Sequence, residues 1–317
     1  MSKSKSQIHT LISGVMGGLL LAFFSQPLIV AQNNNTITNT SSVDLNIFQA
    51  LILGLIQGLT EFIPISSTAH LKVIPVALGW GDPGVTFTAI IQLGSIVAVL
   101  WYFRQDLKDL SMGILKAVKT KNYQAQEFKI GLGIIIGTIP IIIFGLGLKI
   151  LVPDLDNSPF RSLTTIAIAS IVMAILLGMA EKIGSHQRNF DQLSTKDGIL
   201  MGLAESLAII PGVSRSGSTI TAGLFMNLER ATAARFSFLL GIPAITLAGL
   251  VELKDVFEQG LKISYAIPLT VGLISSWIFS YLAIAWLIRF LQKQDTWVFV
   301  WYRLIFGIVI LVAMGNN

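Results

Sequence analysis

The sequence predicts an all-α integral membrane protein, and three observations lead to this fold class. First, 53% of the 317 residues are hydrophobic and only 12% are charged, with a mean hydropathy of +0.73. Soluble domains carry about 25% charged residues, so this chain has too little polar surface for a water-facing globule. Second, long apolar runs recur along the chain, and third, most basic residues lie between those runs. This pattern is typical of several membrane-spanning helices.

Six apolar segments are long enough to cross a bilayer, which requires about 20 residues of helix. The six predicted full transmembrane helices cover residues 85–103, 130–152, 163–180, 231–251, 265–288 and 297–314. The basic residues of the intervening loops are expected to orient these helices in the membrane.

Two further apolar regions, residues 45–79 and 198–228, are interrupted by a proline and a cluster of hydroxyl residues. The first break reads EFIPISSTAH and the second reads PGVSRSGST. Each half is too short to cross the membrane, so we expect two re-entrant helix pairs that return to the face they entered. Irregular backbone at membrane depth is tolerated only where protein buries it or where it lines a water-filled cavity. The alternative is a full transmembrane helix kinked at each proline, but a kink does not account for the polar clusters.

The two breaks also predict an inverted-topology repeat. In the first, GLTEFIP leads to SST, and in the second, SLAIIP leads to SRS. If residue 43 lies outside and both breaks return to their starting face, most of the 22 lysines and arginines fall on inner segments, Arg303 among them. Cytoplasmic loops carry such an excess of basic residues. The two polar breaks should then meet near the membrane midplane.

Residues 1–43 form a separate module ahead of the membrane-embedded domain, which we expect to cover residues 44–317. Lys3 and Lys5 precede an apolar run over residues 11–31, and a polar stretch over residues 32–42 follows it. A cleaved signal peptide and an extra transmembrane helix with a polar linker both fit this pattern.

Composition excludes several kinds of chemistry. The chain has no cysteine, so disulfides and thiolate catalysis are ruled out, and three histidines are too few for a multi-histidine zinc site. The net charge of +5 is accounted for by the basic loops. We therefore expect a membrane partner and no nucleic acid.

Arg215 is the sharpest functional signal, because a guanidinium within an apolar segment costs at least about 2.5–3.5 kcal/mol to insert. Its fork of donors matches phosphate oxygens, and the start of a helix beside it would favour the same anion. Nearby glycines and hydroxyls offer further donors, so the predicted substrate-binding residues of this break are Gly212, Ser214, Ser216, Gly217 and Thr219. The alternative is a structural arginine paired with Glu61 or Glu205.

The first break carries a carboxylate, two serines and an imidazole. Glu61 lies four residues after Gln57, so both share one helical face, and Glu61 can act as a metal ligand, a base or a partner for Arg215. Ser66 and Ser67 are candidate nucleophile and substrate-binding hydroxyls, and His70 can activate a hydroxyl. Each of these residues has a purely structural alternative.

These motifs carry a family resemblance. The stretch QGLTEFIPISSTAHL, residues 57–71, and the stretch PGVSRSGST, residues 211–219, resemble the two signature motifs of the bacitracin-resistance undecaprenyl-diphosphatase family. The resemblance covers roughly residues 44–316. It implies removal of the terminal phosphate of undecaprenyl diphosphate, which recycles the lipid carrier of cell-wall synthesis. It also implies a homodimer in the plasma membrane, an active site open to the outer face, and a divalent cation such as Mg²⁺ or Ca²⁺.

By motif position, the family's glutamate pair falls on Gln57 and Glu61, its serine and histidine on Ser67 and His70, and its arginine on Arg215. Gln57 replaces one carboxylate of the pair. In a metal site of Gln57 and Glu61, the negatively charged ligands must therefore come from Glu61 and from the substrate's phosphates. The resulting hypothesis is that Arg215 binds the diphosphate while Ser67, assisted by His70, attacks the terminal phosphorus or positions a water. A transporter or flippase of polyprenyl phosphate lipids is the alternative, because inverted repeats with re-entrant breaks are typical of transporters.

Overall fold

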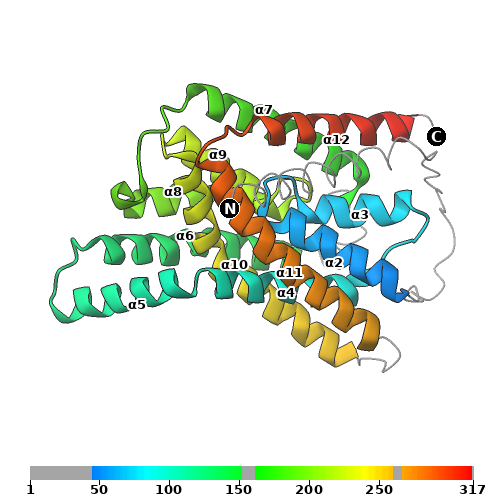
Figure 1. The fold of residues 1–317 in the computed structure, drawn as a ribbon, viewed down its shortest axis with the longest axis horizontal. Helices are drawn as coiled ribbons and strands as arrows, with labels where there is room; N and C mark the ends of the chain where they lie inside the picture. Colours follow the sequence, from blue (N-terminus) through cyan, green and yellow to red (C-terminus); the bar gives the residue numbers. More distant parts are fainter. Residues whose placement is uncertain (1–44, 152–160, 260–265, 316–317) are drawn as a thin grey trace, which may run out of the picture.

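The computed structural model describes residues 45–151, 161–259 and 266–315, and within these ranges the chain is helical, without strands (Figure 1). The predicted module of residues 1–43 lies outside the described residues. The α-helices are α2 Ile47–Phe62, α3 Ser67–Ala77, α4 Gly84–Tyr102, α5 Arg104–Lys119, α6 Gln126–Leu151, α7 Leu163–Ile183, α8 Thr195–Glu205, α9 Arg215–Phe225, α10 Arg230–Gln259, α11 Ala266–Leu291 and α12 Trp297–Gly315. Two short 3₁₀ turns, η2 Phe190–Gln192 and η3 Ser206–Ile209, precede and follow α8.

Five of the six predicted spans are confirmed. In the described ranges, 5 helices are long and apolar enough to cross a membrane, namely α6, α7, α10, α11 and α12. The bent pair of α4 and α5 supplies a sixth candidate, with an angle of 63° between the two helices. The residues after Phe103, which fall between two predicted spans, form helix α5, and this helix projects beyond the bundle together with the start of α6 (Figure 1).

The two broken regions form helix pairs. The outer ends of α2 and α3 lie on the same side of the molecule, and their turn lies inside it (Figure 1). Helices α8 and α9 pack against each other across a second turn, which begins at η3 and ends at Ser214. The re-entrant interpretation of both breaks therefore agrees with the fold, and a single kinked helix does not.

A shared backbone geometry relates the two pairs. Ser66 caps α3 with φ 76° and ψ 99°, and Ser214 caps α9 with φ 71° and ψ 120°. In each case the hydroxyl oxygen accepts a hydrogen bond from the backbone N–H three residues later, at Ala69 or Gly217. A positive φ is uncommon for residues other than glycine. Its recurrence at the same place in both breaks supports the predicted repeat.

The two halves of the chain interlock through their first helices. Helix α2 packs mainly against α11 of the second half, and α8 packs mainly against α6 of the first half. Glycines allow both contacts: a Cβ on Gly54 would collide with the carbonyl of Gly272, and one on Gly202 with the carbonyl of Gly137. Small residues let membrane helices approach this closely.

An ion pair connects the start of α8 to the loop that precedes it. Arg188, in the loop before α8, donates to both carboxylate oxygens of Asp197, at 2.9 and 2.7 Å. Burial alone would raise the pKa of Asp197, but hydrogen bonds from Arg188 and Ser194 outweigh it and lower that pKa below its ordinary value. The pair therefore stabilises the fold at neutral pH, and this contribution is lost as the pH falls through the lowered pKa.

Replacing Gly202 by alanine should destabilise the protein. The added methyl group forces α8 away from α6, and overpacking of this kind costs about 1–3 kcal/mol. The expected result is a lower unfolding temperature in detergent. Gly145→Ala on α6 is the matched control, because nothing lies within 4 Å of a Cβ there. Equal unfolding temperatures for Gly202→Ala and Gly145→Ala would contradict the close contact.

Candidate active site

The two irregular turns meet, and a buried arginine from α12 holds them together. The guanidinium of Arg303 donates to the carbonyl of Pro64 in the first turn at 3.0 Å. It also donates to Gly212 and Val213 in the second turn, at 2.7 and 3.0 Å. Ser216 adds a direct bond between the turns, since its hydroxyl donates to the Ile63 carbonyl at 3.3 Å. The expectation that the two breaks come together is confirmed.

Arg303 was counted above among the basic residues of inner segments, and that assignment is wrong. The residue is only 1% exposed, and its charge faces backbone carbonyls within the protein. It therefore contributes nothing to a surface charge bias and is instead a structural part of the site.

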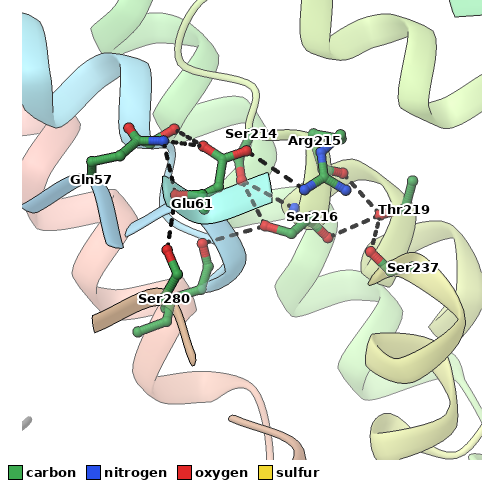
Figure 2. A network of polar contacts seen from close by, with 12 residues as sticks. Gln57, Glu61, Ser214, Arg215, Ser216, Thr219, Ser237 and Ser280 are labelled. Carbon is green, nitrogen blue, oxygen red and sulfur yellow. Dashed lines mark hydrogen bonds and ion pairs between the residues drawn. The ribbon is translucent and has the colours of Figure 1, made fainter. Parts of the chain in front are cut away.

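Arg215 is the first residue of α9, so its backbone lies at the N-terminus of that helix. Its Nη2 atom lies 3.6 Å from Oε1 of Glu61, an ion pair between the two halves of the chain (Figure 2). Yet Nε, Nη1 and Nη2 are buried without a hydrogen-bond partner among the described residues. A buried, unsatisfied donor is costly, and these three nitrogens have unused donor capacity for an acceptor.

The backbone of α10 makes room for this side chain. A Cβ at Gly241 would overlap Nη1 of Arg215. The ring of Phe62 lies on another side, with its centroid 5.9 Å from the guanidinium carbon. Gly241 and Phe62 therefore help to determine the position of the guanidinium relative to Glu61.

Glu61 is the centre of the polar contacts. Its Oε2 accepts the hydroxyl hydrogen of Ser67 at 2.6 Å and an amide hydrogen of Gln57 at 3.1 Å. Gln57 is linked in turn to Ser95, which bonds Ser276 and Ser280 on α11 (Figure 2). Ser67 remains partly exposed. The structure thus places an accessible hydroxyl directly against a carboxylate.

His70 does not contact Ser67 in this arrangement. Its Nδ1 lies 2.7 Å from the Ser66 carbonyl and its Nε2 lies 2.6 Å from the Tyr302 hydroxyl. The imidazole is fully buried and stacks on Phe306 with ring centroids 4.5 Å apart. Both nitrogens are therefore engaged elsewhere, and Glu61 rather than His70 is the group that accepts the Ser67 hydrogen. The observed contacts suit His70 to supporting the Ser66 turn.

The predicted binding residues of the second turn surround Arg215, but their side chains contact protein. Ser214 bonds Gly217 N–H and the Ser216 hydroxyl, and Thr219 bonds the Ser237 hydroxyl at 2.5 Å. Gly212 has φ +95° and lies too close to the Ile166 carbonyl to carry a side chain. These contacts build the turn that presents Arg215. Their role in binding a substrate stays a prediction.

The arrangement combines two chemical capacities. An arginine with unused donors can bind a phosphate through charge-assisted hydrogen bonds. A serine hydroxyl against a carboxylate can act as a nucleophile, because the carboxylate takes its proton. Glu61 joins the two, since it contacts both Ser67 and Arg215.

Comparison with known proteins agrees with this geometry. Residues 50–309 match the model of a family described as bacitracin resistance protein BacA. The chain belongs to this BacA family. A relative from Synechocystis sp., named undecaprenyl-diphosphatase, is 65% identical over 291 residues, which are 92% of this chain and 89% of the relative. Relatives of the same name from Trichormus variabilis and Synechococcus elongatus are 60% identical over 315 residues and 63% over 278, covering 98% and 96% of their lengths.

Both signature motifs lie inside the region matched by the BacA family. Sequence reasoning nevertheless missed three contributors to the site: Arg303, Gly241 and Tyr302. An arginine within the predicted span 297–314 was the available signal for Arg303, because a charge inside an apolar segment needs a partner. Gly241 and Tyr302 look like ordinary residues of membrane helices.

The residues around Glu61 offer few ligands for a divalent cation. One carboxylate is available, and Gln57 faces it through its amide nitrogen rather than its oxygen. No group of three or more histidine, aspartate or glutamate side chains suited to a metal occurs in the described ranges. These residues fit Mg²⁺ only if the ion is coordinated by one carboxylate together with the phosphates of the substrate.

Replacing Gly241 by alanine should displace Arg215 without unfolding the protein, because a flexible side chain yields more readily than the backbone. The affinity for inorganic pyrophosphate should fall by about tenfold or more, as expected for the loss of a charge-assisted hydrogen bond. Isothermal titration calorimetry checks this. In an Arg215→Ala background the same change should have no further effect, and an additive loss there would contradict the role assigned to Gly241.

Proposed function

We propose that this chain is a membrane phosphatase that hydrolyses undecaprenyl diphosphate to undecaprenyl phosphate and inorganic phosphate. The observation that carries the proposal is the joint contact of Glu61 with Ser67 and Arg215. The names of the relatives support this substrate, and the membrane-spanning helices suit its lipid tail.

In the proposed first step, Arg215 binds the diphosphate and Ser67 attacks the terminal phosphorus. The Ser67 proton passes to Glu61 as the new Oγ–P bond forms. The P–O bond to the inner phosphate breaks, and the lipid monophosphate leaves with the electron pair. Phosphoryl transfer depends mainly on positioning and on neutralising negative charge, which the guanidinium and the N-terminus of α9 provide.

In the second step, water cleaves the phosphoserine. Glu61, having passed its proton to the leaving phosphate, takes a proton from the attacking water. As the Oγ–P bond breaks, Glu61 returns that proton to Oγ of Ser67, so the hydroxyl and the carboxylate are both restored and inorganic phosphate is released. His70 acts indirectly in this scheme, because its contacts with Ser66 and Tyr302 hold the turn that presents Ser67.

A divalent cation, Mg²⁺ or Ca²⁺, fits the proposal as a partner of Glu61 and of the substrate's phosphates, with Gln57 alongside. Such an ion would neutralise phosphate charge. We further propose that the enzyme is a homodimer of the plasma membrane whose site opens to the outer face. The excess of basic residues in the loops predicted to lie inside supports this orientation.

The alternative, a transporter or flippase, has a weaker basis. The inverted repeat fits it, but fold alone does not establish function. A carrier has no need of a serine hydroxyl hydrogen-bonded to a carboxylate. Purified protein in detergent, where no gradient exists, should release phosphate from a polyprenyl diphosphate, and a carrier would not.

Ser67→Ala and Glu61→Gln should each lower phosphate release by about 10²–10⁴-fold, the range typical of a lost acid–base or nucleophilic group. Arg215→Lys should also lose activity, because lysine keeps the charge but lacks the fork. Phosphate release from undecaprenyl diphosphate by detergent-purified protein measures these effects. Ser111→Ala, on the exposed face of α5, is the control. Near-normal activity in Ser67→Ala with intact folding would rule out the nucleophile.

A further inference from the structure

A cluster of three buried serines lies behind Gln57, and the mechanism above gives it no role. Ser95 of α4 is 0% exposed, and its hydroxyl oxygen lies 3.1 and 2.8 Å from those of Ser276 and Ser280 on α11. Both α11 serines are also fully buried. The cluster therefore joins α4 and α11 at the point where Gln57 of α2 reaches them.

The hydrogen bonds of Ser95 use its whole capacity. A serine hydroxyl donates one hydrogen bond and accepts up to two. Ser95 accepts one from the Ser280 hydroxyl and one from the Gln57 amide, whose nitrogen lies 3.4 Å away. Its own hydrogen is then left for Ser276. The serines of α11 thus hold Ser95 as an acceptor for the Gln57 amide.

The Gln57 amide passes this constraint to the carboxylate. Its nitrogen donates one hydrogen to Ser95 and the other to Oε2 of Glu61, at 3.1 Å (Figure 2). An ionised carboxylate only accepts, so the nitrogen rather than the oxygen of the amide faces Glu61. Oε2 is also the atom that accepts the Ser67 hydrogen, at 2.6 Å. A continuous chain of hydrogen bonds therefore runs from Ser95 to Ser67.

The packing around the amide leaves little room for a substitute acceptor. Helices α4 and α11 are in close contact, because a Cβ on Gly94 would collide with the carbonyl of Leu273. Gln57 itself is only 2% exposed. Without the Ser95 oxygen, the amide would keep a buried, unpaired hydrogen or rotate away from Glu61. Either result is unfavourable.

We propose that Ser95 is a positioning residue of the phosphatase site: it anchors one amide hydrogen of Gln57, so that the other holds Oε2 of Glu61 against the Ser67 hydroxyl. This proposal rests on the phosphatase function described above. The alternative is that Ser95 only packs helices together, since serines are common where membrane helices meet. The two roles predict different effects on turnover.

Ser95→Ala tests the proposal. The kcat for undecaprenyl diphosphate should fall by about tenfold, as expected for the loss of one hydrogen bond that orients a charged group. KM and the affinity for inorganic pyrophosphate, measured by calorimetry, should change by less than about twofold, because the chain from Ser95 ends at Glu61 and Ser67 rather than at Arg215.

Ser275→Ala is the matched control. Ser275 is a buried serine of the same helix α11, and its hydroxyl donates to the Leu51 carbonyl of α2 at 2.8 Å without contacting Gln57. Both variants lose a buried hydrogen bond between helices, so their unfolding temperatures in detergent should fall by similar amounts. Only Ser95→Ala should lose turnover.

A double-mutant cycle locates the effect at Gln57. Gln57→Ala should lower kcat at least as much as Ser95→Ala does. In the Gln57→Ala background, Ser95→Ala should cause no further loss, because the amide through which Ser95 acts is already absent. A serine that served packing alone would lower kcat by the same factor in both backgrounds.

Three outcomes would overturn the proposal: wild-type kcat in Ser95→Ala, equal losses of kcat in Ser95→Ala and Ser275→Ala, or an additive loss in the Gln57→Ala background. If Ser95→Ala does not fold, Ser95→Cys replaces it, since a thiol keeps the shape but accepts hydrogen bonds weakly. Wild-type kcat in Ser95→Cys would then count against the proposal. Failure of the phosphatase function would look different, since wild-type protein would then release no phosphate at all.

Discussion

The architecture depends on the bonds that Arg303 makes to main-chain carbonyls. Two stretches of irregular backbone lie among apolar helices, where water does not satisfy their polar groups. One guanidinium supplies donors to Pro64 in the first turn and to Gly212 and Val213 in the second. Because both turns bond the same group, their relative position is fixed. The contact between Glu61 and Arg215 follows from that position.

The two buried arginines of the site differ in one respect. Arg303 has its donors occupied by carbonyls of the protein, whereas Arg215 has an ion pair with Glu61 and no hydrogen bond within the described chain. A guanidinium whose donors are all hydrogen-bonded to the protein stabilises the fold. One whose donors are unpaired can bind a ligand. This contrast supports a structural role for Arg303 and the proposed binding role for Arg215, independently of the motifs in which the two residues occur.

The sequence predicted the spans, the two broken helix pairs and their meeting, because apolar length and polar interruption are local properties. It also singled out Glu61, Ser67 and Arg215, and the structure brings the latter two into contact with Glu61. The features that the sequence did not predict depend on contacts between residues far apart in the chain. Carbonyl groups bonded by Arg303 have no sequence signature, and the direction of the His70 ring is set by Tyr302 and Phe306 of α12. Helix α5 was missed because its charges look like those of a loop.

Ser66 and Ser214 cap their helices in the same way, so Ser67 and Arg215 occupy equivalent positions in the two halves of the chain. Each is the first residue of the second helix of its pair. One copy of this position holds Ser67, the proposed nucleophile, and the other holds Arg215, the proposed anion-binding cation. Because the two copies lie in one polypeptide, they carry different side chains, so two similar backbone frames present two different chemical groups to one site.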